Sequence, residues 1–260
     1  MKRNLQNRNF RHRRHMIMAL LQEQGEVSVE HLVRLFDTSE VTIRKDLTAL
    51  EESGFLLRRY GGAILMPKES IDEAADESLS NRKLEIAKRA AERIRDHHRI
   101  IIDSGSTTAA LIKQLNDKQG LVVMTNSLSV ASELCELESE PTLLMTGGTW
   151  DIRSESFQGK VAEQVLRSYD FDQLFIGADG IDLARGTTTF NELINLSRVM
   201  ADVSREVVVM VESQKIGRKM PNLELSWEQI DVLITDDELS EADSEAILAH
   251  NVELICVSAV

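Results

Sequence analysis

The sequence contains few cysteines and no long hydrophobic runs. Only Cys135 and Cys256 occur among its 260 residues, without the spacing of metal ligands, so the sequence predicts no metal site. Two unpaired cysteines fit a reduced, cytoplasmic compartment. No stretch of about 18 or more apolar residues is present, and no apolar segment follows the charged N-terminus, which argues against a membrane span and a signal peptide.

Positive charge is also scarce over most of the chain, whose formal net charge is −13. The basic residues are concentrated at one end: residues 1–66 carry a net charge of +3, and the remainder carries −16. The first 14 residues hold six basic side chains and no acid. An acidic body argues against nucleic-acid binding over the whole surface, whereas a basic end indicates that one domain meets phosphate. A solvated basic tail is the alternative for those 14 residues alone.

Residues 11–65 have the pattern of three short helices followed by a β-hairpin. The first helix is predicted over residues 11–24, where Gly25 ends it, and Ser28 is the predicted N-cap of the second. Two short strands joined by a Gly-Gly turn are predicted within residues 55–65. This order of elements predicts an α+β winged helix-turn-helix domain.

The third predicted helix carries hydroxyl and basic side chains on one face. It begins after a break in which Thr38 or Ser39 is the cap, and Gly54 ends it. Its apolar residues are expected to face the core: Val41, Ile43, Leu47 and Leu50. A local basic helix in an acidic chain is typical of a recognition helix in the major groove of DNA. The alternative for the whole segment is a helical protein-interaction module.

Different roles are predicted for the polar residues of the recognition helix and the hairpin. Thr42 and Arg44 are the candidates for base reading, and Glu40 is expected to accept a hydrogen bond from a cytosine amine. Phosphate contacts, which position a protein without reading sequence, are predicted for four basic residues: Lys45, Arg58, Arg59 and Arg14. Gly61 and Gly62 allow the wing to turn tightly and to approach the DNA backbone.

Two further residues of this segment have a structural explanation. Ser39 belongs to the predicted DNA-binding surface, although N-capping alone would explain its presence. Asp46 is expected to be structural, and to pair with a nearby arginine rather than to face anionic DNA.

From residue 81 onward, helical segments alternate with apolar strands after a polar linker at residues 67–80. Seven strands are predicted: 99–103, 121–124, 142–145, 173–177, 206–211, 232–235 and 252–257. Six helices are predicted before and between them: 82–95, 107–116, 127–137, 155–168, 191–203 and 240–250. Most strands are continuous apolar runs, as buried parallel strands are. We therefore expect an α/β domain with a mostly parallel sheet.

Loops rich in hydroxyl groups or small residues follow four of these strands, at residues 103–108, 125–127, 146–149 and 177–182. In open parallel sheets, ligands bind outside the carboxyl ends of the strands. The first loop combines glycine, hydroxyls and a helix N-terminus, which suits an anion. An ordinary helix cap explains any one of these loops, but four in succession favour a phosphorylated small molecule.

The N-terminal segment resembles the DeoR family of bacterial transcriptional regulators. The resemblance is carried by Arg13-x-x-x-Ile17-x-x-x-Leu21, a gap of 17 residues, and then Ser39-x-x-Thr42-Ile43-Arg44-Lys45-Asp46-Leu47. The wing at residues 58–63 is also similar, with Tyr60 where histidine is more common. The later loops look like the effector domain of the same family, so the resemblance covers nearly the whole chain.

The resemblance implies that the second domain is similar to ribose-5-phosphate isomerases and CoA transferases and that it holds a sugar phosphate. The candidate effector residues are Asp103, Ser104, Gly105, Ser106, Thr107, Thr108, Thr125, Asn126, Gly147, Gly148, Asp179 and Lys215. Lys215 maps onto a family lysine that faces the phosphate, in a segment with three departures: Glu212, Gln214 and Ile216. Four other segments look most like the glucitol operon repressor branch, which implies a hexitol or related sugar phosphate.

An isomerase with an attached DNA-binding module is the alternative to a regulator. Asp179 and Asp182 are then the acid and base that move protons between adjacent carbons. The isomerase pattern also has a lysine in the following glycine-rich loop, where this chain has Arg185, and arginine is a poor proton shuttle. A CoA transferase needs a glutamate nucleophile, for which Glu192 is a weak candidate. We therefore expect binding without turnover.

The resulting hypothesis is a cytoplasmic repressor of a carbohydrate or polyol utilisation operon, released from its operator by a phosphorylated sugar or polyol. Residues 1–66 are assigned to DNA binding, residues 67–80 to a linker and residues 81–260 to the effector. Repeated half-sites in double-stranded operator DNA predict a homo-oligomer, a dimer or a tetramer, assembled through the effector domain. The hypothesis includes no cofactor, no metal, no catalytic residue and no membrane.

Overall fold

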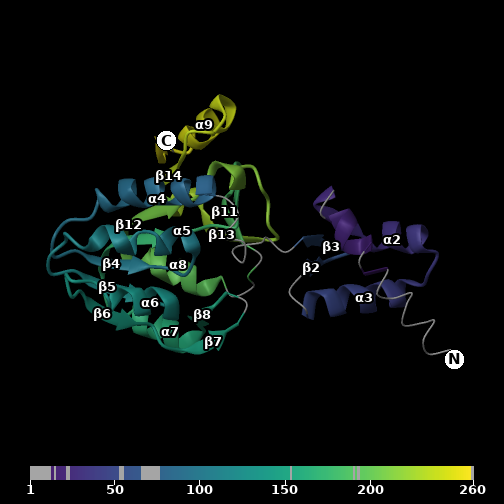
Figure 1. The fold of residues 1–260 in the computed structure, drawn as a ribbon, viewed down its shortest axis with the longest axis horizontal. Coiled ribbons are helices and arrows are strands. Elements are labelled where there is room, and N and C mark those ends of the chain that lie inside the picture. The colour runs from purple at the N-terminus through teal and green to yellow at the C-terminus, as the bar shows by residue number, and fades with distance from the viewer. Residues whose placement is uncertain are drawn as a thin grey trace. The chain divides into compact units, whose positions relative to one another are not determined.

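The computed structural model describes residues 13–14, 16–21, 24–52, 56–65, 77–152, 154–189, 191 and 194–258. The chain divides into two compact units, residues 1–69 and residues 70–260, each of which is described by itself (Figure 1). Among the described residues, no helix has both the length and the apolar character that crossing a lipid bilayer would require.

The first unit combines helices with a three-stranded antiparallel sheet. Residues 16–21 are helical, as predicted. The following elements are β1 (Glu26–Ser28), α2 (Val29–Phe36), α3 (Glu40–Glu52), β2 (Leu56–Arg59) and β3 (Gly62–Leu65), with the strand order β1-β3-β2. The two helices and the hairpin confirm the winged helix-turn-helix prediction. Residues 11–12, 15 and 22–23 of the predicted first helix, and Gly54, lie outside the described residues.

Strand β1 was not predicted. It pairs with β3 in an antiparallel register that places Val27 opposite Ala63. A strand of three residues offers too few positions for an alternating pattern to be recognised in the sequence. Strand β3 of the wing therefore pairs with β2 on one side and, on the other, with β1, which directly precedes α2.

Hydroxyl side chains begin the helices of this unit. The Oγ of Ser28 accepts a hydrogen bond from the backbone N–H of His31 at 3.1 Å and caps α2, as predicted. The Oγ of Ser39 accepts from the backbone N–H of Thr42 at 3.3 Å, which selects Ser39 rather than Thr38 as the hydroxyl that supports the start of α3.

The core of the first unit gathers apolar residues from its helices and strands. Its buried members are Ile17, Leu21, Val27, Val29, Leu32, Ile43, Leu47, Leu50, Leu56 and Ala63. Val41 is not among them, because 62% of its surface is exposed. The prediction that Val41 faces the core is therefore wrong. At about 100° per residue, position 41 lies on the side of α3 opposite to the buried positions.

The second unit is built on a seven-stranded parallel sheet with the order β15-β14-β12-β9-β4-β5-β6. The strands are β4 (Arg99–Ile102), β5 (Val122–Thr125), β6 (Thr142–Met145), β9 (Phe171–Ile176), β12 (Ser204–Met210), β14 (Val232–Asp236) and β15 (Glu253–Val257). Each overlaps a predicted strand, with ends that differ by at most two residues, so the α/β prediction is confirmed. Their continuous apolar sequences are explained by cores on both faces of the sheet.

Helices cover both faces of this sheet (Figure 1). One core receives side chains from α4 (Glu77–Ala91), α5 (Ser106–Ala109), the short 3-10 helix η1 (Ile112–Leu115) and α6 (Leu128–Leu134). The other receives them from α7 (Lys160–Leu166), α8 (Asn195–Asp202) and α9 (Glu241–Leu248). Ile100 and Ile102 face the first core and Ile101 the second, as alternation along a strand requires.

Several boundaries in the second unit differ from prediction. Helix α4 begins at Glu77, inside the predicted linker, and the predicted helix at 107–116 is divided between α5 and η1. Five short strands were missed: β7 (Thr149–Asp151), β8 (Ser156–Gln158), β10 (Gly180–Asp182), β11 (Gly186–Thr189) and β13 (Asn222–Ser226). Strands β10, β11 and β13 form an antiparallel sheet, and β7 pairs with β8. Strand β8 occupies the start of the predicted helix at 155–168.

Candidate functional site

The side of α3 that faces away from the core carries mainly polar and charged side chains. Its exposed residues are Glu40, Val41, Arg44 and Lys45. Three of them were predicted to contact DNA, and the structure brings them together on one surface of the first unit. The buried residues on the other side fix the orientation of the helix, so this surface is a consequence of core packing.

Glu40 and Arg44 form an ion pair on this surface. The Nε and Nη2 atoms of Arg44 both donate to Oε1 of Glu40, at 2.8 and 2.6 Å. Exposed pairs one helical turn apart contribute only about 0.3–0.5 kcal/mol. Glu40 therefore orients the guanidinium of Arg44. Because the pair is weak, the guanidinium can leave Glu40 and bind a guanine instead at little energetic cost.

Ser39 and Thr42 are joined at the start of α3. Their hydroxyl oxygens lie 2.9 Å apart, and the Ser39 oxygen also accepts from the backbone N–H of Thr42. Both hydroxyls thus support the helix terminus. Base reading by Thr42, which remains a prediction, would require its hydroxyl to exchange this contact.

Arg58 and Arg59 lie exposed on β2, beside the turn of the wing. The Nη1 atom of Arg58 donates to Oγ1 of Thr48 at 2.6 Å and lies 3.8 Å from the carboxylate of Glu51. Arg59 pairs with Glu26. Exposed pairs of this kind are weak, so both arginines can exchange their carboxylate partners for the phosphates predicted to bind them.

The two glycines of the wing have different roles. Gly61 has a φ of +81°, which glycine adopts without strain, and it forms the turn with the fully exposed Tyr60. Gly62 lies in β3, where an added Cβ would stand 2.2 Å from the backbone oxygen of Val27. The prediction that both glycines serve the turn is corrected for Gly62, which allows β1 to approach β3.

Arg14 was predicted to contact phosphate, and in the structure it contacts a buried carboxylate. Its Nε atom donates to Asp46 at 2.9 Å, and Arg13 pairs with the same side chain. Asp46 is only 3% exposed. The structural role predicted for Asp46 is confirmed, and the first role of Arg14 is to hold the N-terminal helix against α3.

The candidate effector residues lie at the carboxyl ends of the central strands of the second unit. Strands β5 and β6 follow β4 on one side of the sheet, whereas β9, β12, β14 and β15 follow on the other. The order of the sheet thus reverses between β4 and β9, where ligands of open α/β sheets bind. Asp103 directly follows β4, and Asp179 comes soon after β9.

Asn126 connects the ends of β4 and β5. Its Nδ2 donates to Oδ1 of Asp103 at 2.7 Å, and its Oδ1 accepts from the backbone N–H of Ser104 at 3.1 Å. Burial raises the pKa of Asp103 to about 6, against the opposing effect of the hydrogen bonds from Asn126 and Ser104. Near pH 6 this carboxyl group can either accept a hydrogen bond from a ligand hydroxyl or donate one to it.

Three of the predicted effector residues stabilise the loops themselves. Oγ1 of Thr108 donates to two backbone oxygens of its own loop, at 2.8 and 2.9 Å. Oγ1 of Thr125 accepts from a nearby backbone N–H at 3.1 Å. An added Cβ at Gly148 would stand 2.5 Å from the backbone oxygen of Gln158, so Gly148 allows close packing against β8.

The other loop residues differ in burial. Thr107 is buried, while five are half-buried: Ser104, Gly105, Ser106, Gly147 and Asp179. Helix α5 is a single turn, so the helix N-terminus predicted behind the first loop is short. A ligand at this edge would therefore meet hydroxyls and backbone groups before it meets the buried Asp103 and Thr107.

The negative charge of Asp179 contributes to the raised pKa of Asp103, and the charges of Asp103 and Asp179 act in turn on Glu224. Oγ1 of Thr189 donates to Asp179 at 2.6 Å, and Ser197 donates to Glu224 at 2.7 Å. Burial raises the pKa of Glu224 to about 8, and the negative charges of Asp103 and Asp179 add to the shift. Sequence reasoning missed Glu224. The sequence around Glu224 alternates leucines with polar residues, which indicates a strand but does not show that Glu224 is buried near Asp103.

Two lysines bring positive charge to the same edge. Lys215, in the 3-10 helix η2 (Ser213–Lys215), is buried and donates from Nζ to the backbone oxygen of Ala178 at 3.0 Å. Lys83 of α4 donates from Nζ to Oγ of Ser106 at 2.9 Å. Lys83 was not singled out in the sequence, because nothing in an amphipathic helix indicates which distant loop it will contact.

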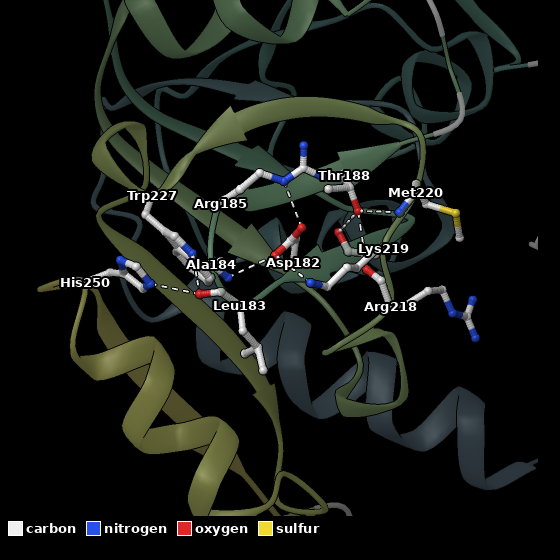
Figure 2. A network of polar contacts seen from close by, with 11 residues as sticks. Asp182, Leu183, Ala184, Arg185, Thr188, Arg218, Lys219, Met220, Trp227 and His250 are labelled. Carbon is white, nitrogen blue, oxygen red and sulfur yellow. Dashed lines mark hydrogen bonds and ion pairs between the residues drawn. The ribbon is translucent and has the colours of Figure 1, made fainter. Parts of the chain in front are cut away.

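Asp182 belongs to a separate polar network on β10 (Figure 2). Its carboxylate accepts from Nε of Arg185 at 2.8 Å and from the backbone N–H of Ala184 at 3.0 Å, and it lies 3.6 Å from Lys219. Burial raises the pKa of Asp182, but these partners outweigh burial and the net shift is downward. A carboxylate held in its ionised form is a poor general acid, which disfavours the proposed isomerase pair with Asp179.

Trp227 and His250 hold the turn that carries this network (Figure 2). Their rings stack with centroids 5.0 Å apart. Nε1 of Trp227 lies 3.1 Å and Nε2 of His250 lies 2.8 Å from the backbone oxygen of Leu183. These contacts hold the backbone that follows β10, whereas Asp179, which precedes β10, is held by the hydroxyl of Thr189.

Two surface hollows lie at the opposite, amino ends of the strands. One is lined in part by Arg99, Tyr169 and Arg205, and the other in part by Arg93 and His98. Neither is lined by a candidate effector residue, so we do not assign the effector to them.

The sequence matches two protein families, one in each unit. Residues 13–69 match the DeoR-like helix-turn-helix domain, and residues 78–237 match the DeoR C terminal sensor domain. A putative aga operon transcriptional repressor of Escherichia coli O157:H7 is 39% identical, over 94% of this chain and 93% of its own. The HTH-type transcriptional regulator GolR of Listeria innocua is 32% identical, over 88% and 92%.

Among solved structures, ribose 5-phosphate isomerase A of Methanocaldococcus jannaschii aligns with 52% of this chain and 53% of its own, at 20% identity and a TM-score of 0.37. A likeness this weak decides nothing about function. The two family matches and the long, similar relatives are decisive. The chain belongs to the DeoR family of transcriptional regulators and is a regulator rather than an enzyme.

Proposed function

We propose that this DeoR family regulator is a cytoplasmic repressor of an operon for the use of a carbohydrate or polyol. The observation that carries the proposal is the exposed charged surface of α3 within a helix-turn-helix unit. The chain is also similar to a protein named as a putative aga operon transcriptional repressor, which supports repression rather than activation. Residues 1–66 bind DNA and residues 81–260 sense the effector. The predicted linker at residues 67–80 joins them, although its last four residues belong to α4.

In this proposal α3 enters the major groove of double-stranded operator DNA. Arg44 and Glu40 face base edges, which read sequence, while Lys45, Arg58 and Arg59 contact phosphates. Repeated half-sites require at least two copies of the first unit, so the active form is a dimer or a tetramer assembled through the second unit. The acidic second unit is repelled by DNA, which confines contact to the basic end.

The effector is a phosphorylated sugar or polyol bound at the carboxyl ends of β4, β5, β6 and β9. Ser104 and Ser106 offer hydroxyl and backbone groups to the phosphate, and Lys83 and Lys215 supply its countercharge. Asp103 is available to the hydroxyl groups of the ligand. The segments that look like the glucitol repressor branch favour a hexitol phosphate within this class.

Effector binding shifts the population of the protein toward an arrangement with weaker DNA affinity. The ligand achieves this only to the extent that it binds that arrangement more tightly than the DNA-bound one. By thermodynamic reciprocity, operator DNA must weaken effector binding by the same factor.

Two measurements on the full chain test the proposal. A thermal-shift screen against sugar and polyol phosphates identifies the effector, since a ligand at 100 times its Kd adds about 2.7 kcal/mol to the stability of the folded state. Selection of duplexes from a randomised pool then yields a bound DNA, from which the effector is expected to displace the protein. A chain that shows no salt-sensitive affinity for any duplex would contradict the proposal.

A further inference from the structure

Val41 is a large apolar residue on the charged surface of α3. It is 62% exposed, in the first turn of the helix. A single exposed apolar residue is ordinary on a protein surface. The position of this one is not ordinary, because the N-terminal residues of a recognition helix are those that meet base edges. Valine is also a mediocre helix former, so helix propensity does not account for its presence.

The neighbours of Val41 belong to the predicted DNA-binding surface. Arg44, Lys45 and Thr48 follow it by three, four and seven residues, the spacings that place side chains on one side of a helix. Thr42 lies on the flank of this surface, where its hydroxyl is held by Ser39. Val41 therefore lies nearer than Thr42 to the middle of the DNA-binding surface of α3.

The major groove offers such a residue one apolar partner. Among the base edges exposed there, only the 5-methyl group of thymine is apolar, and small apolar side chains contact it. We propose that Val41 contacts the 5-methyl group of a thymine in each operator half-site and so determines part of the base preference. This inference rests on the proposed function and adds an apolar reader to the polar ones, Arg44 and Glu40.

The test removes the methyl group from the DNA and the apolar group from the protein, separately and together. The full chain first selects a duplex from a randomised pool, and each thymine of that duplex is then replaced singly by deoxyuridine, which lacks only the methyl group. Dissociation constants are measured at one fixed salt concentration, because affinity depends steeply on salt.

One such replacement in each half-site is expected to raise the Kd of the wild-type chain about fourfold. A change of this size corresponds to the loss of one buried methyl-sized group. The Val41→Ala variant, whose side chain ends at Cβ, is expected to lose most of this difference between the thymine and deoxyuridine duplexes. The Val41→Thr variant keeps one methyl group and is expected to retain part of the difference. Val161→Ala is the matched control, since Val161 is similarly exposed, at 59%, but lies on α7 of the other unit.

The outcomes separate this inference from the function on which it rests. If the wild-type chain is insensitive to every replacement, or if Val41→Ala is as sensitive as the wild type, the contact with thymine is overturned while operator binding stands. If the chain selects no duplex at all, the proposed function is overturned and the inference with it.

Discussion

At the residue scale, α3 presents two kinds of basic contact that mutation can separate. Arg44→Ala is expected to relax base preference at one position, with a loss of roughly 1–3 kcal/mol of discrimination, because a bidentate contact to guanine would be removed. Lys45→Ala is expected to weaken binding to selected and scrambled duplexes alike and to reduce the salt slope by about 1, because only a phosphate contact is lost.

Affinities of both variants for a selected and a scrambled duplex, at several salt concentrations, provide the measurement. Arg34→Ala serves as a control, since Arg34 is an exposed arginine of the same unit on α2. If neither Arg44→Ala nor Lys45→Ala alters binding, α3 is not the recognition helix.

Glu224 makes stability depend on pH. Its pKa is about 8 in the folded chain against an ordinary value near 4.5. As pH rises between these values, the unfolded chain loses the proton that the folded chain keeps, so the free energy of unfolding falls. Asp103, whose pKa is raised to about 6, acts in the same direction over a lower range.

The Glu224→Gln variant keeps a neutral side chain of the same shape at every pH. At pH 8 it is expected to exceed the wild type in stability by about 1 kcal/mol or more, because one unit of pKa corresponds to about 1.4 kcal/mol. Denaturant unfolding between pH 5 and about 8 would show a shallower decline for the variant. Glu228→Gln, at an exposed position, is the control, and identical slopes for Glu224→Gln and the wild type would contradict the prediction.

At the element scale, the wing depends on the pairing of β3 with β1. Gly62→Ala would place a Cβ 2.2 Å from the backbone oxygen of Val27, so β1 must move away and lose its register with β3. The expected cost is about 1–3 kcal/mol or more, as for other overpacked positions. Amide hydrogen exchange in β1 of the full chain is the direct measurement, and faster exchange is expected.

Gly61→Ala is the comparison for Gly62→Ala. The φ of Gly61 is +81°, so alanine is strained there by roughly 1–2 kcal/mol. Among the described residues, however, no atom beyond its two chain neighbours lies within 4 Å of the added Cβ. Gly61→Ala is therefore expected to leave exchange in β1 nearly unchanged. Equal effects of the two substitutions on β1 would show that Gly62 is not a packing position.

At the scale of the whole molecule, DNA binding and effector sensing are expected to fail separately. Lys83→Ala and Lys215→Ala should leave operator affinity within about twofold of the wild type, since neither residue lies in the DNA-binding unit. Both should lose most of the release caused by a sugar or polyol phosphate, because each removes a countercharge from the phosphate. Gel shifts with and without the ligand measure both quantities.

Lys88→Ala is the matched control for Lys83→Ala, because Lys88 is an exposed lysine of α4 that pairs with Glu85. It should bind DNA and respond to the ligand as the wild type does. Undiminished release in the Lys83→Ala variant would remove Lys83 from the effector site, and the same result for Lys215→Ala would remove Lys215.

The amino-acid pattern alone was enough to predict the seven parallel strands in order, the helix-turn-helix and the class of each unit. Continuous apolar runs identified the seven parallel strands, and the spacing of buried residues identified α3, because periodicity reports directly which face of an element is buried. Periodicity did not identify the shortest elements, because β1 and β10 have only three residues each. A uniform assignment of apolar residues to the core also misplaced Val41, whose exposure depends on where the rest of the unit packs.

Contacts between residues far apart in the chain became known from the folded structure. It brought Lys83 to Ser106, Arg14 to Asp46, and Glu224 to the charges of Asp103 and Asp179. It also assigned Gly62 to packing rather than to a turn. A local pattern fixes the direction of a side chain relative to its own helix or strand, but its partner is set by the register and crossing of elements far apart in the chain. Those are properties of the whole packed unit, which no single segment of sequence contains.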